Sequence, residues 1–230
     1  MNFNVPKRLF NAILSIIKHF NIKLQVDDLY GDRDIEWSWI ASNLPAGSGN
    51  ALDFGCGISI LPIITARKGY HVTAIDLEPI EFPYHHQRLK FIQGDLLELD
   101  LQREYFDVIV NCSTVEHVGL VGRYGVKKPK PNGDVEAMIR LSDLIKQDGV
   151  MFLTIPVGLD STFEPLHRVY GKERLPHLLN QFMIIKQDYW VKKARRVWVE
   201  CDKETALNFE PSKHLYALGL FELKKKIPPS

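Results

Sequence analysis

The sequence predicts an α/β fold, in which a doubly wound sheet of mostly parallel strands carries helices on both faces. Three observations predict it. In the central part of the chain, short apolar runs alternate with segments of helical pattern, as in parallel strands joined by helices. Gly69 and Gly149 follow the two clearest helical segments, where a glycine commonly ends a helix. After residue 156 the apolar runs follow one another with little helix between them, which indicates antiparallel strands.

Each expected parallel strand is a short apolar run that is followed by a glycine, a proline or a polar residue. The five runs are 51–54, 71–75, 89–92, 106–110 and 150–155. Helices are expected at 58–68 and 134–146. The stretch 78–88 contains Pro79 and Pro83. Because a proline inside a helix costs about 3 kcal/mol, this stretch predicts an irregular connection.

The later part of the chain predicts a loop and a change of pattern. Residues 119–133 hold four glycines and two prolines, so a long loop is expected directly after the fourth strand. Loops of this length are often functional. Beyond residue 156, a helix is expected at 172–179. The strands expected there are 183–189, 196–200 and 215–223.

Length and composition limit the number of domains and the kinds of partner that the chain can have. The chain has 230 residues, with 29 Lys and Arg, 28 Asp and Glu, and three cysteines. This length predicts one main domain at 49–224, with an N-terminal helical extension at 1–48 and a flexible basic tail at 225–230. The near-zero net charge predicts no nucleic-acid partner. The odd number of cysteines, without C-x-x-C spacing, indicates free thiols in a reducing compartment.

The N-terminal segment 1–24 holds a short apolar run bounded by basic residues. The run is too short for a membrane span, and no small-residue cleavage site follows it, so a cytoplasmic protein is expected. We interpret the segment as an amphipathic helix packed on its own domain. A helix lying on a membrane surface and a helix at a homodimer interface are the alternatives.

The segment Asp53-Phe54-Gly55-Cys56-Gly57 lies between the first strand and the first helix. A glycine pair in this position allows a ligand to approach the backbone closely. Asp76 follows Gly57 by 19 residues, at the end of the second strand, where a carboxylate can accept hydrogen bonds from ribose hydroxyls. Ile60 replaces the third glycine of a dinucleotide motif, and the charge of Asp53 would repel a pyrophosphate. These features predict a nucleoside-containing cofactor that carries positive charge.

Over about residues 50–157 the chain resembles class I S-adenosylmethionine-dependent methyltransferases. Five segments in the family's order carry the resemblance, at 51–57, 74–77, 93–96, 106–113 and 147–156, and Glu116-His117 resembles an element that follows the fourth strand in many small-molecule members. The resemblance implies S-adenosylmethionine as cofactor and a Rossmann-like sheet of seven strands whose last strand is antiparallel. The cofactor-binding residues that it implies are Asp53, Gly55, Cys56, Gly57, Asp76, Leu77, Asp95, Leu96, Asn111 and Ser113. Residues 116–125, 132–134 and 166–171 carry a narrower resemblance, to a subgroup associated with surface-polysaccharide genes, which points to a glycan acceptor.

The family architecture implies that His117 faces the methyl group of the cofactor, so we interpret it as the general base for a hydroxyl acceptor. Glu116 is expected to orient His117 or a group of the substrate, and His167 is a candidate second base or substrate contact. Arg123 and Tyr124 are candidates to bind an anionic or sugar substrate. The alternative for each of these residues is ordinary packing or exposure. Lys127, Lys128 and Lys130 are interpreted as a solvated rim, and no spacing predicts a metal site.

The sequence therefore predicts a methyltransferase that acts on a small molecule or a glycan, at oxygen. Three alternatives stay open. One is a nicotinamide-dependent oxidoreductase, against which Ile60 and Asp53 count. A second is a binding or scaffold protein that uses a methyltransferase fold without catalysis. A third is an RNA methyltransferase, which the near-neutral charge disfavours.

Overall fold

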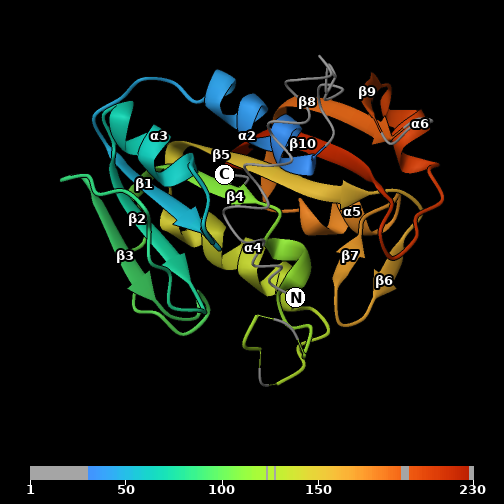
Figure 1. Ribbon diagram of the computed structural model, residues 1–230, viewed down its shortest axis with the longest axis horizontal. Coiled ribbons are helices and arrows are strands. Elements are labelled where there is room, and N and C mark those ends of the chain that lie inside the picture. Colours follow the sequence, from blue (N-terminus) through green and yellow to red (C-terminus); the bar gives the residue numbers. More distant parts are fainter. Residues whose placement is uncertain (1–30, 123, 127, 193–196, 228–230) are drawn as a thin grey trace, which may run out of the picture.

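The computed structural model describes residues 31–122, 124–126, 128–192 and 197–227. Its centre is an eight-stranded sheet with the order β3-β2-β1-β4-β5-β10-β8-β9 (Figure 1). The strands are β1 (Asn50–Phe54), β2 (His71–Asp76), β3 (Leu89–Gln93), β4 (Phe106–Cys112), β5 (Ile145–Val157), β8 (Phe182–Lys192), β9 (Trp198–Cys201) and β10 (Ala217–Lys225). The predicted fold class is confirmed, with eight strands in place of seven.

Strands β3, β2, β1, β4 and β5 run parallel to one another. Asp53 of β1 pairs with Ala74 of β2 on one side and with Val110 of β4 on the other. The three strands therefore end at the same edge of the sheet, and the segments that follow them meet there. As predicted, residues 78–88 join β2 to β3 without a regular helix.

The C-terminal strands complete the sheet in a different order from that of the sequence. β10 lies antiparallel between β5 and β8, which confirms the predicted antiparallel last strand. β9 pairs antiparallel with β8 and supplies the additional strand at the edge. A separate hairpin, β6 (Ser161–Phe163) with β7 (His167–Val169), follows β5 and was not predicted. Strands of three residues are too short to give a readable alternation of apolar residues.

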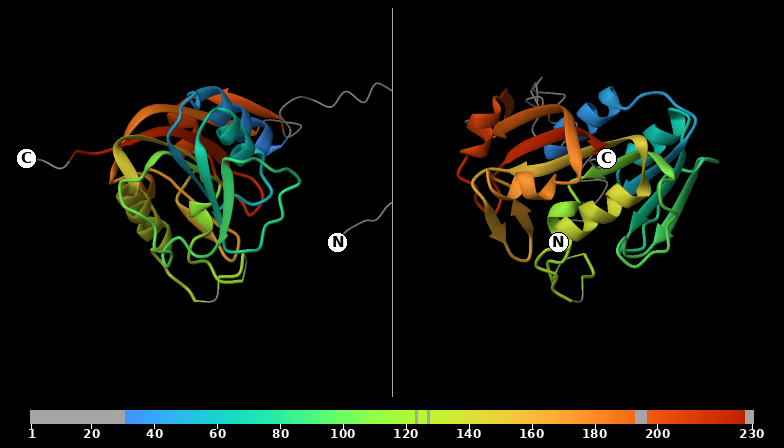
Figure 2. Two further views of the ribbon diagram at one scale, coloured as in Figure 1. Left: turned by 90° about the vertical axis from the view of Figure 1, so that its left-hand side faces the viewer. Right: turned by 180° about the vertical axis from the view of Figure 1, so that it is seen from behind.

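Helices cover both faces of the sheet (Figures 1 and 2). The helices are α2 (Asp32–Asn43), α3 (Leu61–Arg67), α4 (Gly133–Leu144), α5 (Arg174–Leu178) and α6 (Lys203–Leu207), with a 3-10 turn at Val115–His117. Successive residues of β1 face opposite layers. Ala51 packs in the cluster with α2 and α3, and Leu52 packs in the cluster with α4, α5 and α6. This alternation is what places two helical layers on a strand buried on both faces.

The predicted helix at 134–146 ends two residues early. α4 stops at Leu144, and β5 begins directly with Ile145, which is fully buried and pairs with Phe106. Pairing of this apolar side chain in the sheet outweighs the helical pattern at the end of the segment.

Of the expected N-terminal extension, the structure describes the part from residue 31 onward. There α2 packs on the sheet through Ile40, and Leu44 at its end joins the same cluster. The predicted amphipathic helix at 1–24 lies outside the described residues, as does the end of the expected basic tail. Among the described helices, none combines the length and the apolar character that a membrane crossing requires.

Candidate cofactor and acceptor site

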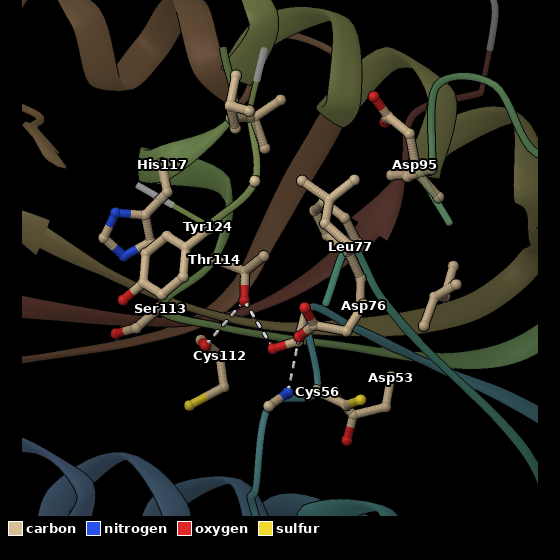
Figure 3. Close-up of a pocket in the computed structure, with 18 of the residues that line it drawn as sticks. Asp53, Cys56, Asp76, Leu77, Asp95, Cys112, Ser113, Thr114, His117 and Tyr124 are labelled. Carbon is tan, nitrogen blue, oxygen red and sulfur yellow. Dashed lines mark hydrogen bonds between the residues drawn. The ribbon is translucent and has the colours of Figure 1, made fainter. Parts of the chain in front are cut away.

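A cavity of about 590 Å³ opens at the carboxyl ends of β1, β2 and β4. The segments that follow β1, β2, β3 and β4 form its walls, and α2 and the loop after the 3-10 turn complete them. In Figure 3, His117 and Tyr124 lie on one side of this cavity, and Asp76, Leu77 and Asp95 lie on the other. The cavity therefore has two halves, which we call the β1–β3 half and the His117 half.

The two glycines of the loop after β1 are required for different structural reasons. Gly55 has φ +65°, and a Cβ at this position would lie 2.0 Å from Thr114 Cγ2, so only glycine fits against the segment after β4. Gly57 has φ +46°, but a Cβ there would meet nothing within 4 Å, because this residue borders open cavity. The Gly57 N–H donates to Asp76 Oδ2 at 2.9 Å, which ties the loop to the end of β2.

Three aspartates line the β1–β3 half. Asp53 is 2% exposed, and burial, with a further contribution from the Asp76 charge, raises its pKa to about 8. Among the described residues, Asp53 Oδ2 has no hydrogen-bond partner. Asp76 accepts backbone N–H groups from Gly57 and Glu78, and Asp95 Oδ1 accepts the Leu97 N–H at 2.9 Å. This half is thus rich in acceptors and negative charge.

His117 ends the 3-10 turn on the opposite side of the cavity. Its Nδ1 lies 2.5 Å from the main-chain oxygen of Leu166. A carbonyl oxygen only accepts hydrogen bonds, so the neutral ring carries its proton on Nδ1 and presents a lone pair at Nε2. The His117 and Tyr124 rings lie 4.9 Å apart between centroids. Tyr124 has φ +53°, a left-handed backbone conformation that residues other than glycine rarely adopt.

Glu116 lies behind His117 and does not line the cavity. It is 1% exposed, and burial raises its pKa to about 8. Its Oε1 is 3.7 Å from His117 Nε2. This position agrees with a role in orienting His117, which stays a prediction, and it excludes direct contact of Glu116 with a molecule in the cavity.

The structure brings most of the predicted site residues together in this one cavity. Those that line it are Asp53, Gly55, Cys56, Gly57, Asp76, Leu77, Asp95, Leu96, Ser113, His117 and Tyr124. Arg123 lies outside the described residues. Lys128 and Lys130, interpreted from the sequence as a solvated rim, also line the cavity.

Two predicted residues lie elsewhere. Asn111 is fully buried in β4, and its Nδ2 is 3.8 Å from Met138 Sδ of α4, so its side chain points to the other side of the sheet edge. His167 is buried in β7, with its ring between those of Phe163 and Tyr216. The expectation that these side chains reach the cavity is corrected. The pleat of β4 directs the Asn111 side chain toward α4, and the β6–β7 hairpin buries the His167 ring against other aromatic side chains.

Helix α2 contributes residues that the sequence did not indicate as functional. Arg33 and Trp37 line the cavity. Between them, Glu36 is fully buried and accepts hydrogen bonds from Arg33, from Ser113 and from Thr154, the last at 2.8 Å. The sequence held one signal of this role, a glutamate between the buried residues Ile35 and Ile40 on the packing face of the helix. Its partners are too distant in the sequence to be read from it.

The loop after the 3-10 turn is held by a buried arginine. Arg168 of β7 is 1% exposed and donates to the main-chain oxygens of Glu116, Val118, Lys130 and Pro131. Its Nε lies 3.7 Å from Asp134 Oδ2, which also accepts from Arg174 and from Tyr170. The segments 132–134 and 166–171, which carried the narrower resemblance, therefore fix the His117 half in place.

Fold and site together define the class: the chain has the Rossmann-like fold of class I S-adenosylmethionine-dependent methyltransferases, with its cavity at the carboxyl ends of the parallel strands. The solved 1,6-didemethyltoxoflavin-N1-methyltransferase of Burkholderia thailandensis, with bound S-adenosylhomocysteine, superimposes with a TM-score of 0.56 at 16% identity, over 94% of this chain and 88% of that chain. The [4+2]-cyclase SpnF superimposes with a TM-score of 0.58 at 14% identity, over 83% and 80%.

The chain belongs to the DUF268 family, described as "Caenorhabditis protein of unknown function", whose family model matches residues 63–214. Among curated proteins it is similar to the ubiquinone biosynthesis O-methyltransferase of Rickettsia akari, with 34% identity over 92 residues, 36% of each chain. The chain spans about a third to a half of the length of the curated relatives that it matches.

Proposed function

We propose that this chain is an S-adenosylmethionine-dependent methyltransferase that transfers a methyl group to a hydroxyl oxygen of a small molecule or glycan, with His117 as general base. The observation that carries the proposal is the division of the cavity into an acidic β1–β3 half and a half that presents a histidine lone pair. The name of the Rickettsia akari relative supports methyl transfer to oxygen, and the S-adenosylhomocysteine bound in the Burkholderia thailandensis structure, an N1-methyltransferase, supports the cofactor.

The residues of the β1–β3 half fit a cofactor of this kind. The Asp53 carboxyl is buried, and its Oδ2 has no partner among the described residues. An ammonium or sulfonium group nearby would stabilise its ionised form, whereas a pyrophosphate would not. Gly57 leaves open space for close approach. Asp76 and Asp95 would accept hydrogen bonds from ribose hydroxyls and from the adenine amino group.

When bound, S-adenosylmethionine supplies an electrophilic methyl group. The task left to the protein is to align the acceptor oxygen and to take up its proton. His117 Nε2 is the basic nitrogen for that proton, because Nδ1 is committed to the Leu166 carbonyl. Arg168 contributes indirectly, since it holds the backbone of the 3-10 turn that carries His117.

The test is calorimetric titration of the purified protein with S-adenosylhomocysteine, with NADH as a parallel ligand. We expect S-adenosylhomocysteine to bind and NADH not to bind. Asp76→Asn should weaken the binding at least about tenfold, because the loop loses its tie to β2 and the ribose loses a charged acceptor. The matched control is Asp143→Asn, an aspartate that pairs with Arg103 outside the cavity. Unchanged binding by a folded Asp76→Asn, or binding of NADH, would contradict the proposal.

A second measurement separates catalysis from a binding or scaffold role. The SpnF neighbour is named as a cyclase, so the fold by itself does not fix the reaction. A screen that follows transfer of a labelled methyl group to sugars and nucleotide sugars addresses this point. Tight binding of S-adenosylhomocysteine without transfer to any hydroxyl compound would favour the scaffold alternative.

A further inference from the structure

The charges and hydrogen-bonding groups of the cavity are segregated. Among the described residues, the acidic residues of the cavity lining lie at the carboxyl ends of β1 and β2 or in the segment after β3: Asp53, Asp76, Asp95 and Glu98. The basic lining residues are Arg33 on α2 and, on the loop that leads away from His117, Lys128 and Lys130. A cationic cofactor in the first half therefore leaves a set of cations facing whatever occupies the second half.

Arg33 is held at the end of β4 by an ion pair with a buried glutamate. Its Nη1 donates to Glu36, and the same nitrogen lies 3.7 Å from Cys112 Sγ at the end of β4. Glu36 is fully buried and is also hydrogen-bonded to Ser113 and Thr154. Its carboxylate is therefore fixed, and it holds the Arg33 guanidinium in place. Both Arg33 contacts use Nη1, and the Arg33 side chain is 48% exposed. Among the described residues, Nη2 and Nε thus keep their donors for a ligand, in the fork geometry that matches a carboxylate or a phosphate.

Trp37 lines the cavity on the same helix, one turn after Arg33, and its Nε1–H is buried away from the cavity space. Lys128 is exposed at the cavity wall, and Lys130 lies 3.9 Å from Glu136. Apart from His117 and Tyr124, the polar lining contributed by α2 and this loop consists of donors.

We infer that the methyl acceptor carries an anionic group, a carboxylate or a phosphate, which binds to Arg33 while a hydroxyl of the same molecule reaches His117. Lys128 and Lys130 attract the anion at the cavity mouth. This inference rests on the proposed function, because it assigns the β1–β3 half to the cofactor. It adds Arg33 as a specificity-determining residue, which selects a charged acceptor over a neutral one with the same hydroxyls.

The experiment uses the protein saturated with S-adenosylhomocysteine and titrates it calorimetrically with compounds that differ in charge. The carboxylate arm compares glucuronate with glucose, the phosphate arm compares glucose 1-phosphate with glucose, and inorganic phosphate serves as a bare anion. We expect at least one anion to bind about tenfold or more tightly than glucose, and NaCl to weaken that binding. The arm that binds identifies which anionic group is recognised.

The variants assign the effect to residues. Arg33→Gln should weaken anion binding at least about tenfold and leave S-adenosylhomocysteine binding within about threefold. Arg103→Gln is its control, since it removes an arginine that pairs with Asp143 at the surface. Because Arg33→Gln deprives buried Glu36 of a partner, Lys128→Glu is tested as well, with the exposed Lys172→Glu as control. Lys128→Glu should weaken anion binding by about three- to tenfold.

The inference is overturned if glucose binds as tightly as the anions, if none of the anions binds, or if both Arg33→Gln and Lys128→Glu bind anions like the wild type. Failure of the proposed function has a different signature, because S-adenosylhomocysteine itself would then not bind and the ternary titrations could not be prepared.

Discussion

His117 owes its chemical character to a main-chain carbonyl. The Leu166 oxygen can only accept, so it selects the tautomer with the proton on Nδ1. The lone pair then lies on Nε2, which is 3.7 Å from Glu116 Oε1. Because Leu166 precedes β7, the hairpin that holds Arg168 also sets the protonation pattern of the proposed base.

Replacement of His117 by Gln should lower methyl transfer by about 10²–10⁴-fold, because a glutamine has no basic nitrogen for the acceptor proton. S-adenosylhomocysteine affinity should stay unchanged, since His117 lies across the cavity from Asp76 and Asp95. The measurement is turnover of the acceptor found in the screen, with calorimetry alongside. His86→Gln, in the connection between β2 and β3, is the matched control. Near-normal turnover by His117→Gln would refute the assignment.

A site residue is predictable from the sequence where it lies at the carboxyl end of a parallel strand or just after it. Asp53 and Asp76 lie at the ends of β1 and β2, and Asp95 follows β3, so their meeting at one edge could be predicted from strand order. Arg33, Glu36 and Trp37 could not be predicted, because they reach the site through helix packing. Glu36 bonds Ser113 and Thr154 across 77 and 118 residues of sequence. A local pattern carries no information about contacts of that range.

At the scale of elements, the contact that positions the His117 half is the attachment of the loop 119–133 to β7. Arg168 reaches four main-chain oxygens on two sides of this loop, and Asp134 binds the arginines Arg168 and Arg174 from the start of α4. The loop was predicted from its glycines and prolines. Its anchor was not, because an arginine in a three-residue strand reads as an exposed charge.

Arg168→Met should lower the free energy of unfolding by about 3–5 kcal/mol, because it leaves Asp134 with less compensation for its buried charge. The loop oxygens would lose their donors at the same time. Urea denaturation measures the change. Arg103→Met, which breaks the partly exposed pair with Asp143, should cost less than about 1 kcal/mol. A similar cost for both variants would contradict the role of Arg168 as an anchor.

At the scale of the whole molecule, two buried carboxyls, Asp53 in the cavity lining and Glu116 beside His117, respond to pH in the same direction. Burial raises the pKa of Asp53 and of Glu116 to about 8. Each group therefore binds its proton more tightly in the folded state than in the unfolded state, where the pKa is about 4. The stability that each one contributes is complete below pH 4 and is lost as the pH rises through 8.

Asp53→Asn and Glu116→Gln replace these carboxyls with groups that do not titrate. The difference in unfolding free energy between variant and wild type should shift in favour of the variant as the pH rises from 5 to 8. This difference should change by at most about 1.4 kcal/mol per pH unit for each carboxyl. Urea titrations at several pH values measure it, with Asp143→Asn as the surface control. Parallel curves for wild type and the buried variants would show that these carboxyls ionise alike in both states.

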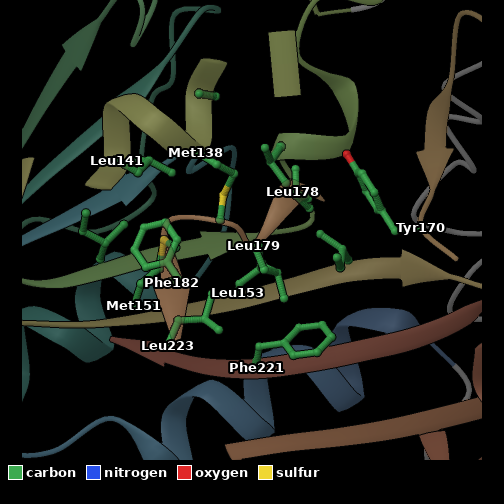
Figure 4. Close-up of a cluster of buried hydrophobic side chains, with 14 of the residues drawn as sticks. Met138, Leu141, Met151, Leu153, Tyr170, Leu178, Leu179, Phe182, Phe221 and Leu223 are labelled. Carbon is green, nitrogen blue, oxygen red and sulfur yellow. The ribbon is translucent and has the colours of Figure 1, made fainter. Parts of the chain in front are cut away.

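The position of β10 bears on how the molecule is made on the ribosome. β10 follows β8 and β9 in the sequence, yet it lies between β5 and β8. Its Phe221 and Leu223 pair with Leu153 and Met151 of β5 and complete the cluster in Figure 4. Until residues 217–225 emerge, the nascent chain has five parallel strands and a detached β8–β9 hairpin, with open backbone along β5 and β8. Open strand edges can pair with other chains, so translation of β10 removes two sites at which the nascent protein would aggregate.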